Sequence, residues 1–406
     1  MDSLITAAGR ALAQGDVLGA LKRVALRNDA PALALRGIAM ARLGDFERAR
    51  NLLQRAAKTF SPKETVARAR CMVALAEIAL VSRDLGWSTR PLETAVAVLE
   101  NHKDLLNLAQ ARLIQVRRLV LIGKLNAAER KLGALDPTPL SPALRAGYEL
   151  AVAGIAIRRV RAVAAQQALA RAKTAARAAG IGALAAEIDS ASLALKEPAA
   201  LLISGGDTQP LPLAEVEALY ATDRMIVDGC LHVLHYTQGV IQFVNRPVLF
   251  VLLRALAEAW PDDVPRNTLV TRAFRGKQAD ESYRARLRVE MGRLRRILRS
   301  AAEIRATDNG FVLAVRGNNG VAVLAPPYAG DNAAVLALLS DGESWSSSAL
   351  GLALGISQRT VQRGLDSLAE AGKVQSFGSG PARRWTAPPL PGITTTLLLP
   401  VPLPGD

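Results

Sequence analysis

The sequence predicts a mainly α-helical protein with small β-hairpins, and three observations support this fold class. Half of the 406 residues are apolar but only 4% are aromatic, so the cores must consist largely of Ala, Leu and Val, which suits closely packed helices. Residues 1–195 place apolar residues at i, i+3 and i+4 with few prolines, whereas short runs with period two begin at residue 224. The length itself indicates about two to four domains.

The first half of the chain repeats a helix–turn–helix pattern. In each strong copy one helix ends at a glycine, which closes a helix in the left-handed conformation, and a second helix follows with an alanine that permits close helix contact. After the first step the spacing is about 40 residues, a period typical of paired helices. The strong copies have Gly15 and Ala20, Gly44 and Ala49, and Gly123 and Ala128, and weaker copies lie at 82–99 and 158–172.

The best copy, RGIAMARLGDFERARNLLQRAA at 36–57, resembles a tetratricopeptide-type repeat. Its period is longer and looser than that family's. The resemblance implies that residues 1–200 form a helical-repeat domain that binds a protein or peptide partner, senses a signal or mediates oligomerisation. An irregular all-helical bundle is the alternative interpretation.

The charge of the chain points to a polyanionic partner. Lys and Arg number 51 against 36 Asp and Glu, which gives a net charge of +15 and favours nucleic acid first and an anionic membrane second. Residues 1–200 hold 30 basic and 17 acidic residues, and within the second half the segment 266–299 holds 11 and three. The arginines of the first half fit either a groove for an acidic peptide or a surface along DNA backbone.

The sequence also predicts where the protein works. Its two cysteines, Cys71 and Cys230, are too few for a disulfide framework, the first residues lack the apolar core of a signal peptide, and no apolar run is long enough to span a membrane. We therefore expect a cytoplasmic protein without membrane contact. SGGDTQPLP at 204–212 reads as part of a linker over 201–223, and the Pro-rich tail 388–406 reads as a strap or a docking segment.

Residues 224–326 combine strands with three helices. The runs MIVDGCLHVLHY and GVIQFVNR predict strands joined by a turn near 237–239, and the Asn309–Gly310 and Asn319–Gly320 pairs predict turns that separate the apolar runs FVLAV and VAVLA. The helices are expected at 247–260, with a proline at its start, at 264–274 and at 280–299.

The third of these helices is rich in arginine. Leu287, Met291, Leu294 and Leu298 fall on one stripe that Tyr283 extends, so this side should pack on the preceding helices while the arginines lie toward the other side. A basic helix is often only a solvated surface, but an anchored helix with a cationic face also suits the major groove of DNA.

The stretch 224–324 resembles the winged-helix effector domain of OmpR-type response regulators. LVTRAFRG, RLRRIL at 293–298 and ATDNGFVLA at 306–314 carry the resemblance. It implies DNA contacts by Arg284 and Arg288 at bases or phosphates, by Arg293, Arg295 and Arg296 at phosphates or the domain core, by Asn309 on the wing, and by Arg266, Asn267 and Thr268 on the preceding helix. Two departures are the lack of a phosphoacceptor receiver domain and an arginine, Arg288, where an acid is common, which leaves the base preference open.

Residues 331–387 predict a second module of the same kind. Its pattern is helix, helix, a turn at Gly355 and Ile356, a third helix capped by Ser357, and the hairpin KVQSFGSGPARRW. Val361, Leu365 and Leu368 should be buried. The module resembles the winged helix-turn-helix of bacterial repressors, and the expected DNA contacts are Ser357, Gln358, Arg359, Thr360, Gln362, Arg363, Arg383 and Arg384. A winged helix that contacts only proteins is the alternative.

No residue pattern predicts catalysis. CLHVLH offers Cys230, His232 and His235, but on a strand the first two share a face that His235 does not, so we expect no metal site. The chain has three histidines and no phosphate-loop or dinucleotide fingerprint, and we expect neither enzyme activity nor a cofactor. The sequence thus predicts a bacterial-type transcription regulator that binds double-stranded DNA through two tandem winged helices, with a homodimer compatible. The alternative is a protein-interaction scaffold.

Overall fold

The computed structural model describes residues 2–386 apart from 85, 244–245, 275–280, 316–319, 328–331, 340–343 and 381–382. The chain forms two compact units. The helical unit contains Met1–Arg159, Val163–Leu193 and the chain from Val335 onward, and the sheet unit contains Val160–Ala162 and Ala194–Ala334. Within the described part of the chain, none of the helices combines the length and the apolar character that crossing a bilayer requires. The protein is mainly helical, as the composition predicts.

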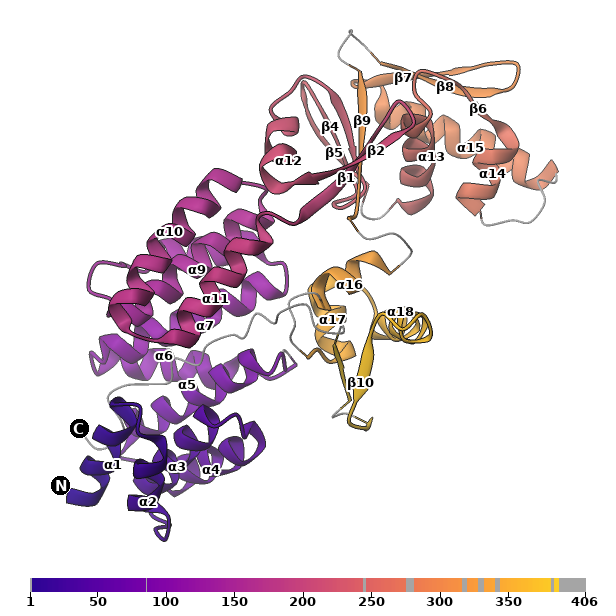
Figure 1. Ribbon diagram of the computed structural model, residues 1–406. Helices are drawn as coiled ribbons and strands as arrows, with labels where there is room; N and C mark the ends of the chain where they lie inside the picture. The colour runs from indigo at the N-terminus through magenta and orange to yellow at the C-terminus, as the bar shows by residue number, and fades with distance from the viewer. Residues whose placement is uncertain are drawn as a thin grey trace. The chain divides into compact units, whose positions relative to one another are not determined.

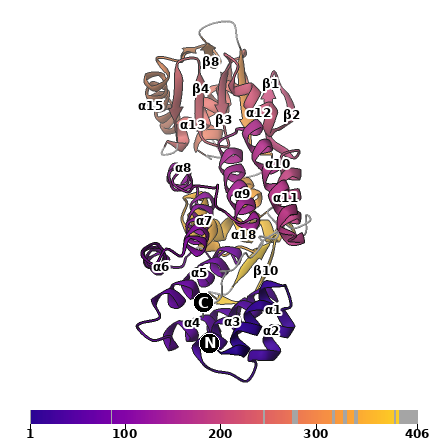
Figure 2. The same cartoon turned by 90° about the vertical axis from the view of Figure 1, so that its left-hand side faces the viewer.

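Eleven helices follow one another in chain order through the first part of the helical unit (Figures 1 and 2). From α1 to α9 consecutive helices pack on each other, and the buried positions between them are largely alanine and leucine. The helices are α1 (Ser3–Ala13), α2 (Val17–Val24), α3 (Ala30–Arg42), α4 (Phe46–Thr59), α5 (Thr65–Val81), α6 (Arg90–Asn101), α7 (Leu105–Leu121), α8 (Leu125–Gly133), α9 (Pro142–Arg158), α10 (Ala162–Ala179) and α11 (Gly182–Ala194).

The turns between paired helices form as the sequence predicts. Gly44 adopts a φ of +84°, and the carboxylate of the next residue, Asp45, accepts a hydrogen bond from the Arg48 amide at 3.1 Å, so one residue closes a helix and the next caps the following one. Gly15 and Asp16 do the same between α1 and α2. The alanines expected at close contacts, Ala20, Ala49 and Ala128, are all buried.

The C-terminal part of the helical unit contains α16 (Ala333–Leu339), α17 (Ser347–Leu354), α18 (Gln358–Glu370) and a hairpin of β10 (Gln375–Phe377) and β11 (Arg384–Thr386). Trp345 and Trp385 are buried and exchange two backbone hydrogen bonds of 2.8 Å, which tie the hairpin to the start of α17. Their apolar cluster continues without a break into α5, α6 and α7, where the Arg83 guanidinium lies 5.6 Å from the Trp345 ring centre. The C-terminal helices therefore pack on the first half of the chain.

The sheet unit is built around a six-stranded sheet with the order β2-β1-β9-β3-β4-β5. β3 and β9 are parallel, and the other neighbours are antiparallel. The elements are β1 (Pro198–Ser204), β2 (Asp207–Pro212), α12 (Leu213–Tyr220), β3 (Met225–Asp228), β4 (Val233–Tyr236), β5 (Gly239–Gln242) and β9 (Val321–Ala325).

Helices cover both faces of this sheet. Ile226 and Leu324 pack with α12 on one face, whereas Met225 and Val323 pack with α13 (Pro247–Glu258) on the other (Figure 1). All residues of β9 are buried, which explains why its sequence VAVLA is apolar throughout rather than alternating.

Three helices and a second sheet complete the unit. α13, α14 (Arg266–Phe274) and α15 (Glu281–Leu298) pack together beside a three-stranded sheet of order β6-β8-β7. Its strands are β6 (Val264–Pro265), β7 (Ala302–Ala306) and β8 (Gly310–Val315), and the turn of the β7–β8 hairpin contains Asn309, as the Asn-Gly pair predicts. The second expected turn, at Asn319, lies outside the described residues.

A linker was expected over 201–223, and this prediction was wrong because the segment is folded. Its first part belongs to the β1–β2 hairpin, whose turn is formed by Gly205 and Gly206, and its last part is α12. β2 is an edge strand, where polar residues and Pro210 are tolerated because one side of the strand needs no partner. The expected winged-helix region 224–326 therefore belongs to a larger unit, whose main part runs from Ala194 to Ala334.

The segment CLHVLH also differs from the expected single strand. Gly229 to His232 form a turn between β3 and β4, in which the buried Asp228 carboxylate accepts hydrogen bonds from the amides of Cys230 (2.6 Å) and Leu231 (3.0 Å). An acceptor of this kind stabilises a turn over a strand. Among the described residues, no three His, Cys, Asp or Glu side chains gather to hold a metal ion.

Candidate nucleic-acid interface

Two surfaces contain the residues expected to contact DNA, and α15 is the centre of the first. Leu287, Met291, Leu294 and Leu298 are all buried, so the stripe anchors the helix in the core of the sheet unit as the sequence predicts. The ring of Tyr283 stacks on Phe274 with centroids 5.8 Å apart, which fixes the start of α15 against α14. Because the apolar side faces inward, the arginine-rich side is left to solvent.

The arginines at the start of α15 are available to an anion. Arg284 and Arg288 are exposed and lie 3.9 and 3.2 Å from the exposed carboxylate of Glu281. Exposed ion pairs of this type contribute little to stability, so a phosphate can replace the carboxylate at small cost. Val289, on the same helix, is exposed as well, so an apolar side chain accompanies the cations of this surface.

Two of the expected DNA contacts instead support the hairpin. Arg295 donates a hydrogen bond from Nε to the Ile304 carbonyl at 2.8 Å, and Arg266 donates to the carbonyls of Thr307 and Asp308, each at 2.8 Å. Both guanidinium groups also lie over the Phe311 ring. These contacts hold the β7–β8 hairpin against the helices. Contact with the domain core was the expected alternative for Arg293, Arg295 and Arg296, but not for Arg266.

The end of α15 forms a basic hollow with the start of α13. Arg293 and Arg296 line it together with Arg246, the residue that precedes α13. Arg293 pairs with Glu290 at 2.9 Å, whereas Arg296 has no ion-pair partner in the described part of the chain. Arg246 was not among the expected DNA contacts, because it is far from α15 in the chain and only the fold brings the two together.

The other side of α15 faces β7 and carries a second basic hollow. Arg299 and Arg305 line it, Arg305 pairs with Glu303 of the same hollow at 2.9 Å, and neither arginine was among the expected DNA contacts. The remaining expected contacts of this unit, Asn267, Thr268 and Asn309, are exposed at the first turn of α14 and in the hairpin turn. The start of α14 thus lies against the hairpin turn, and basic hollows lie on both flanks of α15.

The second surface is the turn between α17 and α18. Gly355 ends α17 with a φ of +66°, and Ser357 caps α18 by accepting a hydrogen bond from the Thr360 amide at 3.2 Å. Val361, Leu365 and Leu368 are buried, as expected from their spacing. An ideal Cβ on Gly351 would lie 3.0 Å from the Ile356 carbonyl, a tight contact that a glycine avoids where the turn crosses α17.

The outward side of α18 carries the expected polar residues. Arg359 and Arg363 are exposed, and neither has an acidic partner within the described residues. Gln358 donates to Ser347 Oγ and Gln362 to Asp366, each at 3.0 Å, so both amides lie within the surface but are held by neighbours. Ile356 was expected to help define the turn, but 42% of it is exposed, so it does not anchor the turn in the core.

The β10–β11 hairpin flanks α18 in sequence and carries the last expected contacts. Arg383 donates to Ser376 Oγ at 3.1 Å and lies 4.3 Å from the Trp385 ring centre, and Arg384 donates to the Arg383 carbonyl at 3.2 Å. Phe377 is 53% exposed at the end of β10. The Pro-rich tail 388–406 lies outside the described residues.

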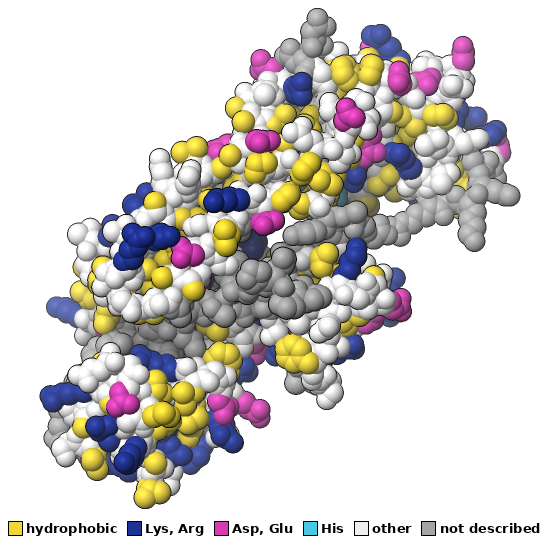
Figure 3. All heavy atoms as spheres, viewed as in Figure 1, with side chains coloured by type: hydrophobic (Ala, Val, Ile, Leu, Met, Phe, Trp, Pro, Cys, Tyr) yellow, Lys and Arg dark blue, Asp and Glu magenta, His cyan; other side chains and the backbone are white. Residues whose placement is uncertain are grey.

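Most of the chain's excess charge lies elsewhere, in α1–α11. On the face drawn in Figure 3, the Lys and Arg side chains of these helices are spread out rather than gathered in one patch. Several bind acids of neighbouring segments, as in the pairs Arg70–Asp104 and Arg117–Glu187, both at 2.9 Å.

Compared with known proteins, the chain matches no family model, no curated protein and no solved structure.

Proposed function

We propose that the protein is a transcription regulator that binds double-stranded DNA with sequence preference through two winged-helix modules, one in each unit. The observation that carries the proposal is that the same arrangement occurs twice. In each module a helix is anchored by a buried apolar stripe, exposes arginines on its outer side, and is followed by an antiparallel hairpin. This arrangement is typical of helices that enter the major groove.

Each surface offers the two kinds of contact that DNA recognition requires. Exposed arginines such as Arg296 and Arg359 supply phosphate contacts, which provide affinity and orient the protein without reading sequence. Arg284, Arg288 and Thr360 lie toward the start of their helices, where side chains reach base edges. The helices α1–α11 serve in this proposal as a helical-repeat domain for a partner or for self-association, in a cytoplasmic protein.

The first test is the salt dependence of DNA binding. We expect the affinity for a duplex selected for tight binding to fall steeply between about 50 and 200 mM salt. Each phosphate contact releases counterions and contributes roughly −0.9 to the slope of log binding constant against log salt concentration. A fluorescence-anisotropy titration with the selected duplex and a scrambled one measures both the slope and the sequence preference. Weak binding that ignores both sequence and salt would support the interaction scaffold instead.

The second test removes one arginine from each surface. We expect Arg288→Ala and Arg363→Ala each to weaken binding to the selected duplex by roughly 5- to 100-fold, since a good base contact contributes about 1–3 kcal/mol of discrimination. Both side chains are exposed, so circular dichroism should show unchanged folding. Arg48→Ala, at an exposed arginine of α4 outside both surfaces, is the matched control. Equal affinity of all three variants and the parent protein contradicts the assignment.

A further inference from the structure

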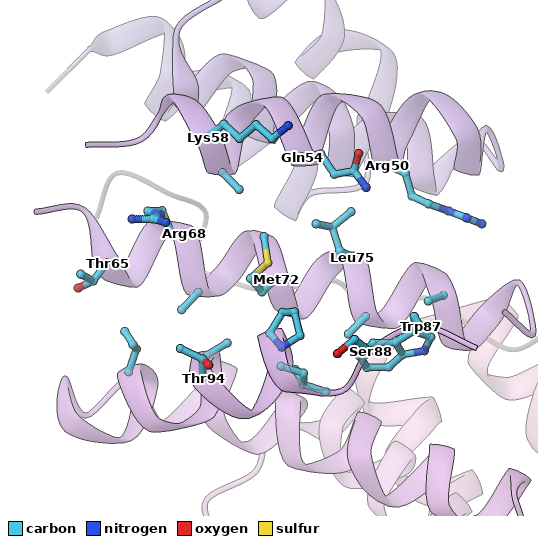
Figure 4. A pocket seen from close by; sticks show the side chains of 18 of the residues that line it. Arg50, Gln54, Lys58, Thr65, Arg68, Met72, Leu75, Trp87, Ser88 and Thr94 are labelled. Atoms are coloured by element: carbon cyan, nitrogen blue, oxygen red, sulfur yellow. The ribbon is translucent and has the colours of Figure 1, made fainter. Parts of the chain in front are cut away.

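A groove runs along α5 between α4 and α6, and none of its lining residues belongs to either candidate DNA surface (Figure 4). α5 forms its floor, and side chains of α4 and α6 form its walls. The floor residues follow the spacing of one helix face, so the groove extends along that face from Thr65 to Ala79. At 1.5 Å per residue this distance is about 21 Å, the length of a helix of roughly 14 residues.

Apolar side chains, many of them alanines, form much of the floor and walls of the groove. Ala57, Ala76 and Ala95 come from three different helices, and their short side chains leave the space between the helices unfilled. Met72 and Leu75 rise from the floor and remain partly exposed. A methionine in such a place adapts to the shape of an occupant.

The charge of the groove is positive. Its lining contains Arg50, Lys58 and Arg68 but a single acid, Asp84, which lies 3.4 Å from Arg50. Lys58 and Arg68 have no acidic partner among the described residues. Figure 4 shows Arg68 near the end of the groove where Thr65 lies and the Lys58 amine farther along, toward the middle of the groove. The part of the groove from Thr65 to its middle therefore carries two cations that can pair with carboxylates.

The walls favour a helix over an extended peptide as the occupant. Helices that have formed their internal hydrogen bonds present no free backbone donors or acceptors, so an extended strand would leave its own backbone unpaired in the groove. A helix satisfies its backbone internally, and alanines on the walls permit the close axial approach that helix packing requires. A second copy of this chain is disfavoured because the copies would repel, each with a net charge of +15.

We propose that the groove along α5 binds an amphipathic helix of a partner protein, with acidic residues in the part that meets Lys58 and Arg68. The apolar side of this helix covers Met72 and Leu75, and its carboxylates pair with the two free cations. The site does not depend on the proposed DNA binding, since it shares no residue with either DNA surface.

The proposal is tested by panning a phage library of random 14-residue peptides against the full chain. We expect enriched clones to carry apolar residues at helical spacing and acidic residues toward one end. Synthetic peptides from these clones should bind a Lys58→Glu/Arg68→Glu variant about tenfold or more weakly, because the charge complementarity is reversed. Thr94→Trp, at an exposed wall position, should abolish binding by filling the groove.

The matched control is Arg48→Glu/Arg55→Glu, which makes the same change in net charge on exposed positions of α4 that do not line the groove. It should bind the peptides like the parent protein, and circular dichroism should show that all variants fold. The proposal is overturned if no clones are enriched, if they lack acidic residues, if Thr94→Trp binds them normally, or if both charge variants lose affinity equally. Displacement of bound peptide by stoichiometric palmitate would assign the groove to acyl chains and also overturn it. DNA binding of these variants, measured separately, should match the parent.

Discussion

His235 shows how a single residue responds to its surroundings in the sheet unit. Its ring lies 4.5 Å from that of Tyr220, and its Nε2 atom is buried without a hydrogen-bond partner in the described part of the chain. Removal from water disfavours the charged imidazolium and lowers the pKa of His235, although the nearby Asp228 carboxylate opposes this effect. The folded protein therefore holds His235 neutral at pH values where a free histidine is protonated.

We expect the sheet unit to lose stability as the pH falls below about 6.5, because the unfolded chain then binds a proton at His235 that the folded chain does not. The effect is absent above this pH and complete once the pH lies below the lowered pKa. His235→Phe keeps the ring contact with Tyr220 and should flatten the dependence. Urea unfolding at intervals between about pH 7.5 and 5.5 measures this, and parallel curves for parent and variant would contradict it.

Arginine roles are the part of the site that sequence reasoning resolves least well. The burial of Leu287 and Leu294 follows from spacing alone, because helix geometry fixes which side chains share a face. Arg266 and Arg295 bind backbone carbonyls of the hairpin, 41 and nine residues away, and no local pattern distinguishes them from the freely exposed Arg296. Long cationic side chains find their partners only after the fold has formed.

At the scale of elements, α15 contains a glycine in its interior that no packing contact explains. Nothing lies within 4 Å of an ideal Cβ at Gly292, which is exposed on the outer side of the helix between Val289 and Arg296. A glycine in a helix interior costs about 0.5–1 kcal/mol relative to alanine. The glycine therefore makes the centre of α15 less stable than an alanine at this position would.

We expect Gly292→Ala to raise the free energy of unfolding of the sheet unit by about 0.5–1 kcal/mol, since alanine fits the open space and favours the helix. The reciprocal change Ala285→Gly, on the same exposed side, should lower it by a similar amount. Chemical denaturation followed by circular dichroism measures both. A loss of stability in Gly292→Ala would show that the position has a contact in the folded protein.

Elements with strong local signals are predictable from this sequence, and elements defined by distant partners are not. The turn at Gly44, the cap at Ser357 and the hairpin turn at Asn309 were predicted because the residue itself dictates the backbone. The β1–β2 hairpin was mistaken for a linker, because its pairing with β9 joins Leu202 to Leu324 across more than a hundred residues. Its polar edge strand resembles a loop when the sheet is unknown.

At the scale of the whole molecule, the order of modules in the sequence differs from their grouping in space. A linear reading of the sequence predicts three successive modules, but the third one packs on the first through a shared apolar cluster that includes Leu80, Leu99, Trp345 and Leu350. The contact between Arg83 and Trp345 belongs to the same junction. Apolar faces of this kind are visible in a sequence, but their partners are not.

We expect a chain that ends at residue 330 to have a destabilised helical unit, because α5, α6 and α7 lose apolar neighbours that keep them buried. The thermal midpoint should fall by on the order of 5–10 °C, which corresponds to a few kcal/mol for a unit of this size. Dye binding to exposed apolar surface should rise. A chain ending at residue 386 removes only the tail and is the control, and equal midpoints for both chains would refute the shared core.

The docking of the C-terminal helices on α5–α7 also has a consequence for the newly made protein. These helices leave the ribosome more than two hundred residues before α16 does, which at about 5–20 residues per second leaves their apolar face bare for roughly 10–40 s. During that interval the nascent chain presents the kind of surface that chaperones hold. Premature termination within the sheet unit would leave that surface permanently uncovered and direct the fragment to proteolysis.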